Sequence, residues 1–315
     1  MTDECIFAGF PLDPADHFRD DEEWLVSSRA AKSSRFLLYG RGRPLMDISK
    51  GLRDISKGLR PAYKTAQDIN AITGGDWDNT DWVFIGTDGD AAIFAVAVGG
   101  KLALGAHEKF IDLRSFALQV GARGFNAMPS LLGRGKMLLE WQGRRHFCSC
   151  CGYKTRTERG GYVRKCLNEA CGADHFPRTD PVVIMLVISG DKCLLGRGKG
   201  WPEGNYSALA GFMEPGETIE EAVQREVREE SGIEIGRVNY VKSQPWPFPS
   251  SLMIGVRAEA LTTKITLDTN ELEDANWFDK AYLQDVFESG GSPSFKIPPK
   301  IAIARFLLDA WLQED

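Results

Sequence analysis

The sequence predicts an α+β protein in which a mixed sheet packs between helices, preceded by a smaller α+β domain. The first observation is that apolar, strand-like runs come in pairs around short turns. Residues 81–86 and 91–98 flank an Asp-Gly turn, and residues 181–188 and 192–197 flank Ser189-Gly190-Asp191. The second observation is a run of helix formers at 219–231 without glycine or proline. Together they favour a sheet covered by helices.

The remaining elements are expected in chain order as helices at 113–120 and 126–141, a hairpin strand at 160–165, strands at 237–243, 251–260 and 276–278, and helices at 281–288 and 299–312. Pro299 suits a helix start. A length of 315 residues indicates about two domains. We place an N-terminal domain at 1–142, a cysteine-rich segment at 143–177 and the larger domain at 178–315.

Composition and charge exclude several classes of protein. Hydrophobic residues make up 43% of the chain and charged residues 26%, as in an ordinary globular protein. The net charge of −6 argues against a surface that binds nucleic acid as a whole. An apolar run of about 18 residues would be needed for a membrane span and is absent. The N-terminus lacks the pattern of a signal peptide, so we expect a cytoplasmic protein.

A glutamate-rich helix face is the strongest functional signal. Glu226, Glu229 and Glu230 are spaced i, i+3 and i+4, which places three carboxylates on one face. Carboxylate oxygens are ligands that Mg²⁺ prefers, and Mg²⁺ often joins them to substrate phosphates. The alternative is a solvated acidic face. Thr218 and Glu221 form the pattern of a capping box, and Arg225 can orient one of the acids.

Four cysteines have the spacing of a metal site. Cys148 and Cys151 form a CxxC pair, and Cys166 with Cys171 forms a second pair after a predicted hairpin. Two such pairs can supply four thiolates to one Zn²⁺ per chain, and a four-cysteine site is structural because no position is open for water. Cys150 fits neither pair. Free thiols, disulfides and nucleic-acid binding by this segment are the alternatives.

Residues 211–233 resemble the Nudix box in every fixed position, from Gly211 through Glu217, Arg225-Glu226 and Glu229-Glu230 to Gly232. The resemblance implies an α/β/α sandwich and hydrolysis of a nucleoside diphosphate linked to another group. It implies that Glu226, Glu229 and Glu230 bind two or more Mg²⁺ or Mn²⁺ ions, with Glu229 or Glu230 also acting as base. Glu217 is expected to pair with Arg225.

A second signature, SQPWPFPSS, spans residues 243–251. Its three prolines predict a rigid extended segment rather than a strand hydrogen-bonded in a sheet, with aromatic rings suited to stacking. The alternative is a surface loop with packed rings. The array resembles the one that marks the NADH pyrophosphatase branch of the Nudix family, which also has a four-cysteine zinc ribbon and a smaller N-terminal domain.

The resemblance to that branch implies further site residues. Glu271 occupies the position of an additional metal-binding carboxylate, with Glu273 and Asp274 as neighbouring alternatives. Substrate contacts are implied for a set of residues around the base and phosphates: Phe176, Ile184, Phe212, Gln244, Trp246, Phe248, Ser251 and Ala304. Trp246 can reach a partner's site in this branch, so a homodimer is implied.

The expected reaction is therefore metal-dependent hydrolysis of the pyrophosphate bond of NAD(H), giving NMN(H) and AMP. Removal of NAD caps from RNA 5′ ends uses the same bond and residues and remains the main alternative. A Nudix hydrolase for ADP-ribose or diadenosine polyphosphates, and a zinc-ribbon binding module with an inactive Nudix domain, are further alternatives. The sequence does not separate NADH from NAD⁺, or Mg²⁺ from Mn²⁺.

One local feature stands outside this scheme. The heptapeptide DISKGLR occurs twice in succession, at 47–53 and 54–60. Two copies are too few for a solenoid. We expect a duplicated surface loop, and a basic patch for anionic ligands is the alternative.

Overall fold

The computed structural model describes residues 5–49, 59–100, 102–121 and 127–314. The chain divides into two compact units. One, the C-terminal unit, comprises Met1–Ile6, Thr179–Trp246 and Ser251–Asp315, and the other, the N-terminal unit, comprises Phe7–Arg178 and Pro247–Ser250. Most of the duplicated heptapeptide, residues 50–58, lies outside the described residues, so the prediction of a surface loop stays a prediction.

The C-terminal unit is built on a mixed sheet. Its strands are β10 (Asp180–Ser189), β11 (Lys192–Gly198), β12 (Leu209–Phe212), β13 (Ile235–Trp246), β14 (Ser251–Ala260) and β15 (Leu272–Asp279). Their order is β13-β14-β10-β11-β15, and β12 pairs with β10. β10 and β14 run parallel, whereas the other pairs are antiparallel. The predicted mixed sheet and the hairpin around Ser189-Gly190-Asp191 are confirmed.

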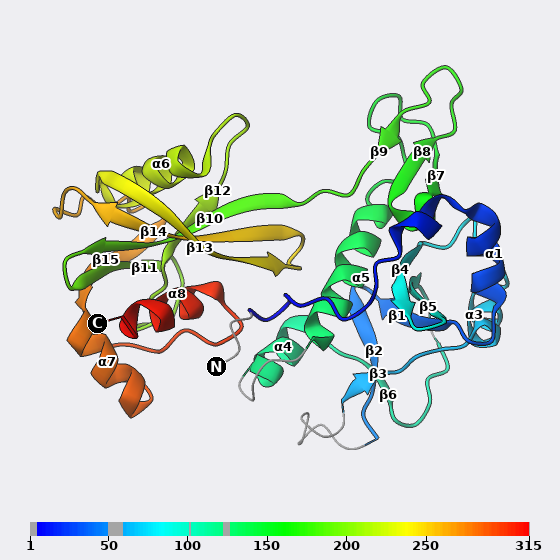
Figure 1. Ribbon diagram of the computed structural model, residues 1–315, viewed down its shortest axis with the longest axis horizontal. Coiled ribbons are helices and arrows are strands. Elements are labelled where there is room, and N and C mark those ends of the chain that lie inside the picture. The colour runs from blue at the N-terminus through cyan, green and yellow to red at the C-terminus, as the bar shows by residue number, and fades with distance from the viewer. Residues whose placement is uncertain (1–4, 50–58, 101, 122–126, 315) are drawn as a thin grey trace. The chain divides into compact units, whose positions relative to one another are not determined.

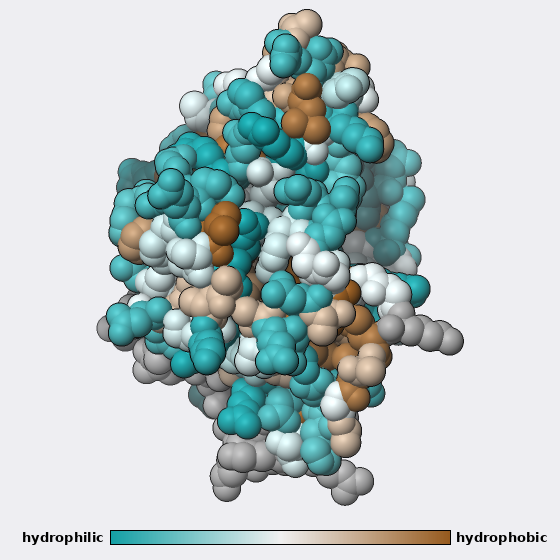
Figure 2. Space-filling model, turned by 90° about the vertical axis from the view of Figure 1, so that its right-hand side faces the viewer, coloured by the Kyte–Doolittle hydropathy of each residue, from teal (hydrophilic) through white to brown (hydrophobic). Residues whose placement is uncertain are grey.

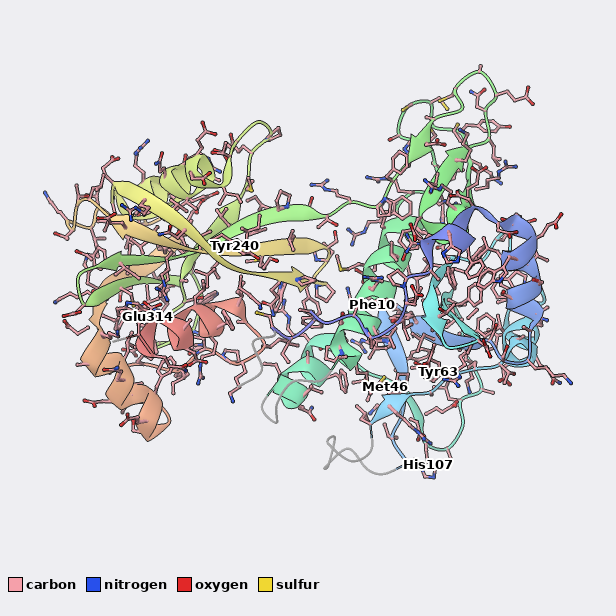
Figure 3. All side chains as sticks on the ribbon, in the orientation of Figure 1. Phe10, Met46, Tyr63, His107, Tyr240 and Glu314 are labelled. Carbon is pink, nitrogen blue, oxygen red and sulfur yellow. The ribbon has the colours of Figure 1, made fainter. Side chains whose placement is uncertain are left out.

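Helices cover both faces of this sheet (Figure 1). α6 (Ile219–Ser231) lies on one face and α8 (Ile303–Leu312) on the other, with α7 (Lys280–Ser289) beside α8. Val183, Met185 and Val187 of β10 share one hydrophobic cluster with the apolar side of α6. Glu314, labelled in Figure 3, fixes the end of the chain by accepting a hydrogen bond of 2.5 Å from Arg257 of β14. The predicted sandwich is confirmed.

Two predictions about local structure were wrong. Gln244 to Trp246 belong to β13 and pair with β14 as far as Trp246↔Ser251, although we expected no sheet pairing here. β13 is an edge strand, and an edge tolerates a proline because only one side of the strand needs hydrogen bonds. α8 begins at Ile303 rather than at Pro299, because Pro299 starts a turn that the Ala302 N–H closes at 3.0 Å.

The N-terminal unit has a second sheet with the order β3-β2-β1-β5-β4, and β6 pairs with β2. The strands are β1 (Arg35–Gly40), β2 (Arg43–Asp47), β3 (Arg60–Pro61), β4 (Trp82–Asp88), β5 (Ala91–Val98) and β6 (Glu108–Phe110). The helices are α1 (Glu22–Ala30), α3 (Ala66–Thr73), α4 (Leu113–Gly121) and α5 (Met128–Gly143), with a 3₁₀ turn, η1, at Asp16–Asp20. The predicted hairpin of β4 and β5 and both predicted helices are confirmed.

A small three-stranded sheet completes this unit. It consists of β7 (Thr155–Glu158), β8 (Val163–Cys166) and β9 (Asp174–His175), with a 3₁₀ turn, η2, at Arg159–Gly161. On the face of the molecule shown in Figure 2, hydrophilic residues predominate and hydrophobic ones lie in small groups. Within the described residues, no helix is both long and apolar enough to cross a membrane.

Candidate active site

The glutamate-rich helix α6 is capped at both ends. Thr218 accepts a hydrogen bond from the Glu221 N–H at 3.2 Å, and Glu221 accepts one from the Thr218 N–H at 2.8 Å, which confirms the capping box. Gly232 ends the helix with a left-handed φ of 69°. These two caps define both ends of α6, on which Glu226, Glu229 and Glu230 lie at i, i+3 and i+4.

Arg225 ties the preceding loop to the helix. Its guanidinium donates to both carboxylate oxygens of Glu217, at 2.5 and 2.8 Å, and to Glu226 at 2.8 Å. It also donates to Glu229 at 3.2 Å and to the carbonyl oxygen of Phe212 at 2.9 Å. The Arg225 hydrogen bonds lower the pKa of Glu217 to about 2. The Arg225 guanidinium thus connects three carboxylates with the backbone at the end of β12.

Gly211 makes room for one of the carboxylates. A Cβ atom built on Gly211 would overlap the carboxylate of Glu226. Glu226 is half-buried, and burial raises its pKa despite the neighbouring Arg225. The first glycine of the Nudix pattern is therefore required here for close approach to a functional side chain rather than for an unusual φ.

Glu230 is the least solvated of the acids. Its residue is 6% exposed, and its Oε2 atom is buried without a hydrogen-bond partner in the described structure. Burial, and then the charges of Glu226, Glu271, Asp268 and Glu229, raise its pKa to about 8. A buried carboxylate oxygen without a donor, surrounded by like charge, is the electrostatic setting that a divalent cation would satisfy.

A loop from outside the box brings Glu271 toward this cluster. The Thr266 N–H donates to the Ser231 carbonyl at 2.8 Å, and the Asp268 N–H donates to the Glu230 carbonyl at 3.0 Å. The charge of Glu271 acts on both Glu226 and Glu230, which places it near them.

The two alternatives to Glu271 have other partners. Glu273 binds Arg197 at 2.6 Å, and Asp274 accepts hydrogen bonds from Tyr206 and Asn276. Sequence reasoning did not consider Asp268, which accepts hydrogen bonds from the backbone and side chain of Asn270 and shapes the loop. The only available signal was the Asp-x-Asn pattern of a turn.

The expected substrate contacts of the C-terminal unit lie on the opposite face of the sheet. Cross-strand partners share a face. Phe212 pairs with Val182, and Val182 pairs with Met253, which in turn pairs with Gln244. By the same register Ile184, Trp246 and Ser251 share this face, and α8, which carries Ala304, covers it.

These residues differ in how accessible they are. The Phe212 side chain is 61% exposed, whereas Ile184 and Ala304 are buried in the core. Gln244 is fully buried: its amide donates to the Ile6 and Ile301 carbonyls at 2.7 and 2.8 Å and accepts from the Ile303 N–H at 2.9 Å. Its polar atoms are therefore occupied within the chain, while Phe212 is free to stack.

Two other expected contacts belong to the N-terminal unit. Phe248 packs edge-on against Phe7, with ring centroids 5.6 Å apart, and lies 4.7 Å from the Arg114 guanidinium. Phe176 follows β9 and is 61% exposed. The structure does not bring these two rings together with Phe212 within one unit.

The four predicted cysteines converge. The Sγ atoms of Cys148, Cys151, Cys166 and Cys171 all lie within 4.8 Å of one another, closely enough to hold a metal ion. Among the described residues this is the one such group, so the glutamate oxygens of α6 are more widely spread. Burial raises the pKa of Cys148, but N–H groups of Cys150 and Cys151 and the His175 ring, 3.2 Å away, outweigh it and the pKa falls to about 5. Such a thiolate is the form that binds metals.

Comparison with known proteins agrees with this geometry. A family model described as the NUDIX domain matches residues 178–294, and one described as an NADH pyrophosphatase-like rudimentary NUDIX domain matches residues 33–141. The chain belongs to the NADH pyrophosphatase branch of the Nudix hydrolase family.

Named relatives of this Nudix hydrolase come from animals, plants and bacteria. It is 35% identical to the "NAD-capped RNA hydrolase NUDT12" of Macaca fascicularis, over 99% of this chain and 74% of that protein. It is 39% identical to the "NAD-capped RNA hydrolase NudC" of Stutzerimonas stutzeri, over 64% of this chain and 66% of that protein. The human "NAD(P)H pyrophosphatase NUDT13, mitochondrial" is 38% identical over 65% of this chain and 60% of its own length.

Proposed function

We propose that this Nudix hydrolase cleaves the pyrophosphate bond of NAD(H) and releases NMN(H) and AMP. The observation that carries the proposal is the pair Gly211 and Phe212 on β12. Neighbouring strand residues face opposite ways, so Gly211 admits the Glu226 carboxylate on the α6 face while Phe212 presents an exposed ring on the other. The end of one strand therefore joins a carboxylate cluster to a stacking surface, as a dinucleotide requires.

The carboxylates fit a site for two or more Mg²⁺ or Mn²⁺ ions. Glu226, Glu229, Glu230 and Glu271 would hold them, since burial and the neighbouring negative charges raise the pKa of Glu226 and of Glu230, and Glu230 has an oxygen without a donor. When bound, the ions neutralise phosphate charge and acidify a water molecule. Arg225 keeps Glu226 and Glu229 oriented, with Glu217 as its anchor. Either Glu229, which is exposed, or Glu230 serves as base.

Recognition of the rings would use the α8 face of the sheet. The exposed Phe212 ring would stack on nicotinamide, and Trp246, at the end of the edge strand β13, would reach the site of a second subunit in a homodimer. The buried residues Ile184 and Ala304 would pack beneath the bound rings. Gln244 would hold the backbone of Ile301 and Ile303 in place. Phe176, Phe248 and Ser251 remain proposed contacts whose test is mutational.

The cysteine quartet would bind one structural Zn²⁺. Its four thiols are close enough to surround a single ion, and all four positions are occupied by protein. We propose that residues 143–177 fold as a zinc ribbon, distinct from an N-terminal domain at 1–142 and a catalytic domain at 178–315.

A rate comparison on one helix tests the catalytic assignment. Glu229→Gln should lower the rate of NADH hydrolysis with Mg²⁺ by a factor of about 100 or more, because a metal-binding or base carboxylate is lost. Glu220→Gln, an exposed residue in the first turn of the same helix, is the matched control and should retain activity. Equal rates in both variants would remove Glu229 from the mechanism.

NAD-capped RNA is a second candidate substrate, and the cysteine-rich segment favours it. Residues 143–177 contain seven Lys or Arg against three Asp or Glu, in a chain whose net charge is −6. Phe147, Tyr153 and Phe176 in this segment are more than half exposed. Cations interleaved with exposed rings suit single-stranded RNA. Lys154→Glu should raise the KM for NAD-capped RNA and leave that for NADH unchanged, and an unchanged KM for both would contradict this role.

A further inference from the structure

The N-terminal unit contains a hollow of about 550 Å³ that the proposed chemistry does not use. Its volume is in the range of pockets that hold small organic ligands. It lies beyond Gly40 and Val98, which are paired residues at the carboxyl ends of the parallel strands β1 and β5. In sheets with parallel strands, ligands bind outside the carboxyl ends of those strands. The hollow lies at the equivalent end of this parallel pair.

Two cations stand at the rim of this hollow. Arg41 and Arg43 both line it and are exposed, and within the described residues neither guanidinium group forms a hydrogen bond or an ion pair. The acids in their surroundings have other partners: Glu140 binds Lys136 at 2.7 Å, and Asp112, which feels the charge of Arg43, accepts two hydrogen bonds of 2.8 Å from Ser115. Among the described residues these two guanidinium groups form no ion pair with a carboxylate, so they can receive a phosphate group.

The backbone beside the hollow is strained at Arg41 and uncovered at Gly99 and Gly100. Arg41 and Gly42 form the two-residue turn between β1 and β2, with φ of 53° and 72°. A left-handed arginine is strained, whereas this turn type prefers asparagine or glycine. Opposite the turn, Gly99 and Gly100 leave the backbone uncovered, since a Cβ on either would meet nothing within 4 Å. The sequence thus keeps a charged residue where a small one would fit better.

The remaining walls are apolar. Val98 and Leu102 line the hollow, and Phe110 of β6 points its ring tip at Gly40, where an added Cβ would lie 3.0 Å from Cζ. Phosphate alone would leave this apolar surface and most of the volume unused. A phosphate joined to a flat ring would use the cations and the apolar wall together.

We propose that this hollow binds a nucleoside monophosphate, with its phosphate between Arg41 and Arg43 and its base against Phe110. The site is independent of the hydrolytic reaction, and it gives the N-terminal unit a ligand of its own. AMP is a suitable probe because it carries both parts of the proposed ligand.

Hydrogen–deuterium exchange of the zinc-loaded full-length protein tests this site locally. AMP should slow exchange in peptides covering 40–43 and 98–100, and it should do so at concentrations at which inorganic phosphate or adenosine has little effect. The Arg41→Gln/Arg43→Gln double variant should require at least about ten times the AMP concentration for the same protection, because charge-assisted contacts are lost. Lys32→Gln, an exposed cation elsewhere in the unit, is the matched control and should behave as the wild type.

A second variant guards against misfolding of the first. Gly99→Phe places a ring in open space and should block AMP without removing a charge. The proposal would be overturned if AMP gave no protection of these peptides in the wild type, or if it protected both variants as well as the wild type. Equal effects of phosphate and AMP would overturn the assignment of a nucleotide. Because the readout is confined to residues 40–43 and 98–100, loss of NADH hydrolysis has no bearing on it.

Discussion

Gly211 lies so close to Glu226 that a methyl group on its Cα would overlap the carboxylate of that side chain. Gly211→Ala should therefore displace Glu226 and lower kcat/KM for NADH by a factor of about 100, because a shift of about 1 Å in a catalytic group can cost that much. Steady-state kinetics with Mg²⁺ measures it. Gly143→Ala, where the new Cβ would make only an ordinary contact with Asp81, is the control. Full activity of Gly211→Ala would show that Glu226 need not hold its position.

The local part of this site could be predicted from the sequence. The bounds of α6, its capping box and the pairing of Glu217 with Arg225 follow from spacings of a few residues, which a helix converts directly into neighbours. The reason for Gly211 could not be predicted, because it depends on how β12 approaches α6. Glu271 is predicted by the family resemblance alone. The hydrogen bonds that attach its loop to Ser231 and Glu230 explain why it lies near α6.

The role of Gln244 could not be predicted from the sequence, because it depends on contacts between residues far apart in the chain. Its amide binds the carbonyl of Ile6, a residue 238 positions away, and no periodicity carries that information. The edge position of β13, which permits Pro245 within a paired strand, is likewise a property of the whole sheet.

Gln244→Leu should destabilise the protein rather than weaken substrate binding. The change removes three hydrogen bonds and leaves Ile6, Ile301 and Ile303 with buried, unpaired backbone groups, at a cost of about 3 kcal/mol. Denaturant unfolding measures the loss, and KM for NADH should stay constant where the variant is folded. Gln284→Leu removes a single, partly buried hydrogen bond, to the Leu312 carbonyl, and should cost about 1 kcal/mol. A raised KM for NADH in Gln244→Leu, together with unchanged stability, would instead show that Gln244 contacts the substrate.

Zinc content should depend on the quartet and not on its neighbour. Cys166→Ser removes one of four converging thiols, so we expect the bound zinc to fall well below one ion per chain and Tm to drop. Cys150→Ser, which changes an exposed thiol outside the quartet, should keep the zinc. Elemental analysis of purified protein measures both. Retention of zinc by Cys166→Ser would mean that another residue completes the site.

The stability of the protein without divalent ions should fall as pH rises from about 4.5 to about 8. Burial raises the folded-state pKa of Glu230 to about 8, so the folded state holds a proton that the unfolded state has already released. Its contribution is fully present below 4.5 and is lost on approaching 8, with a slope of at most about 1.4 kcal/mol per pH unit. Urea unfolding at several pH values should show this slope in the wild type and in Glu220→Gln, and a smaller slope in Glu230→Gln, in which the raised pKa of Glu226 remains. Identical curves for all three would contradict the assignment.

The central claim is most directly tested by identifying the products formed from NADH with Mg²⁺ and after its removal by a chelator. We predict AMP and reduced NMN in equal amounts, formed only with the divalent ion and lost in Glu230→Gln. Release of nicotinamide with ADP-ribose, or product formation that survives both the chelator and the substitution, would contradict the account.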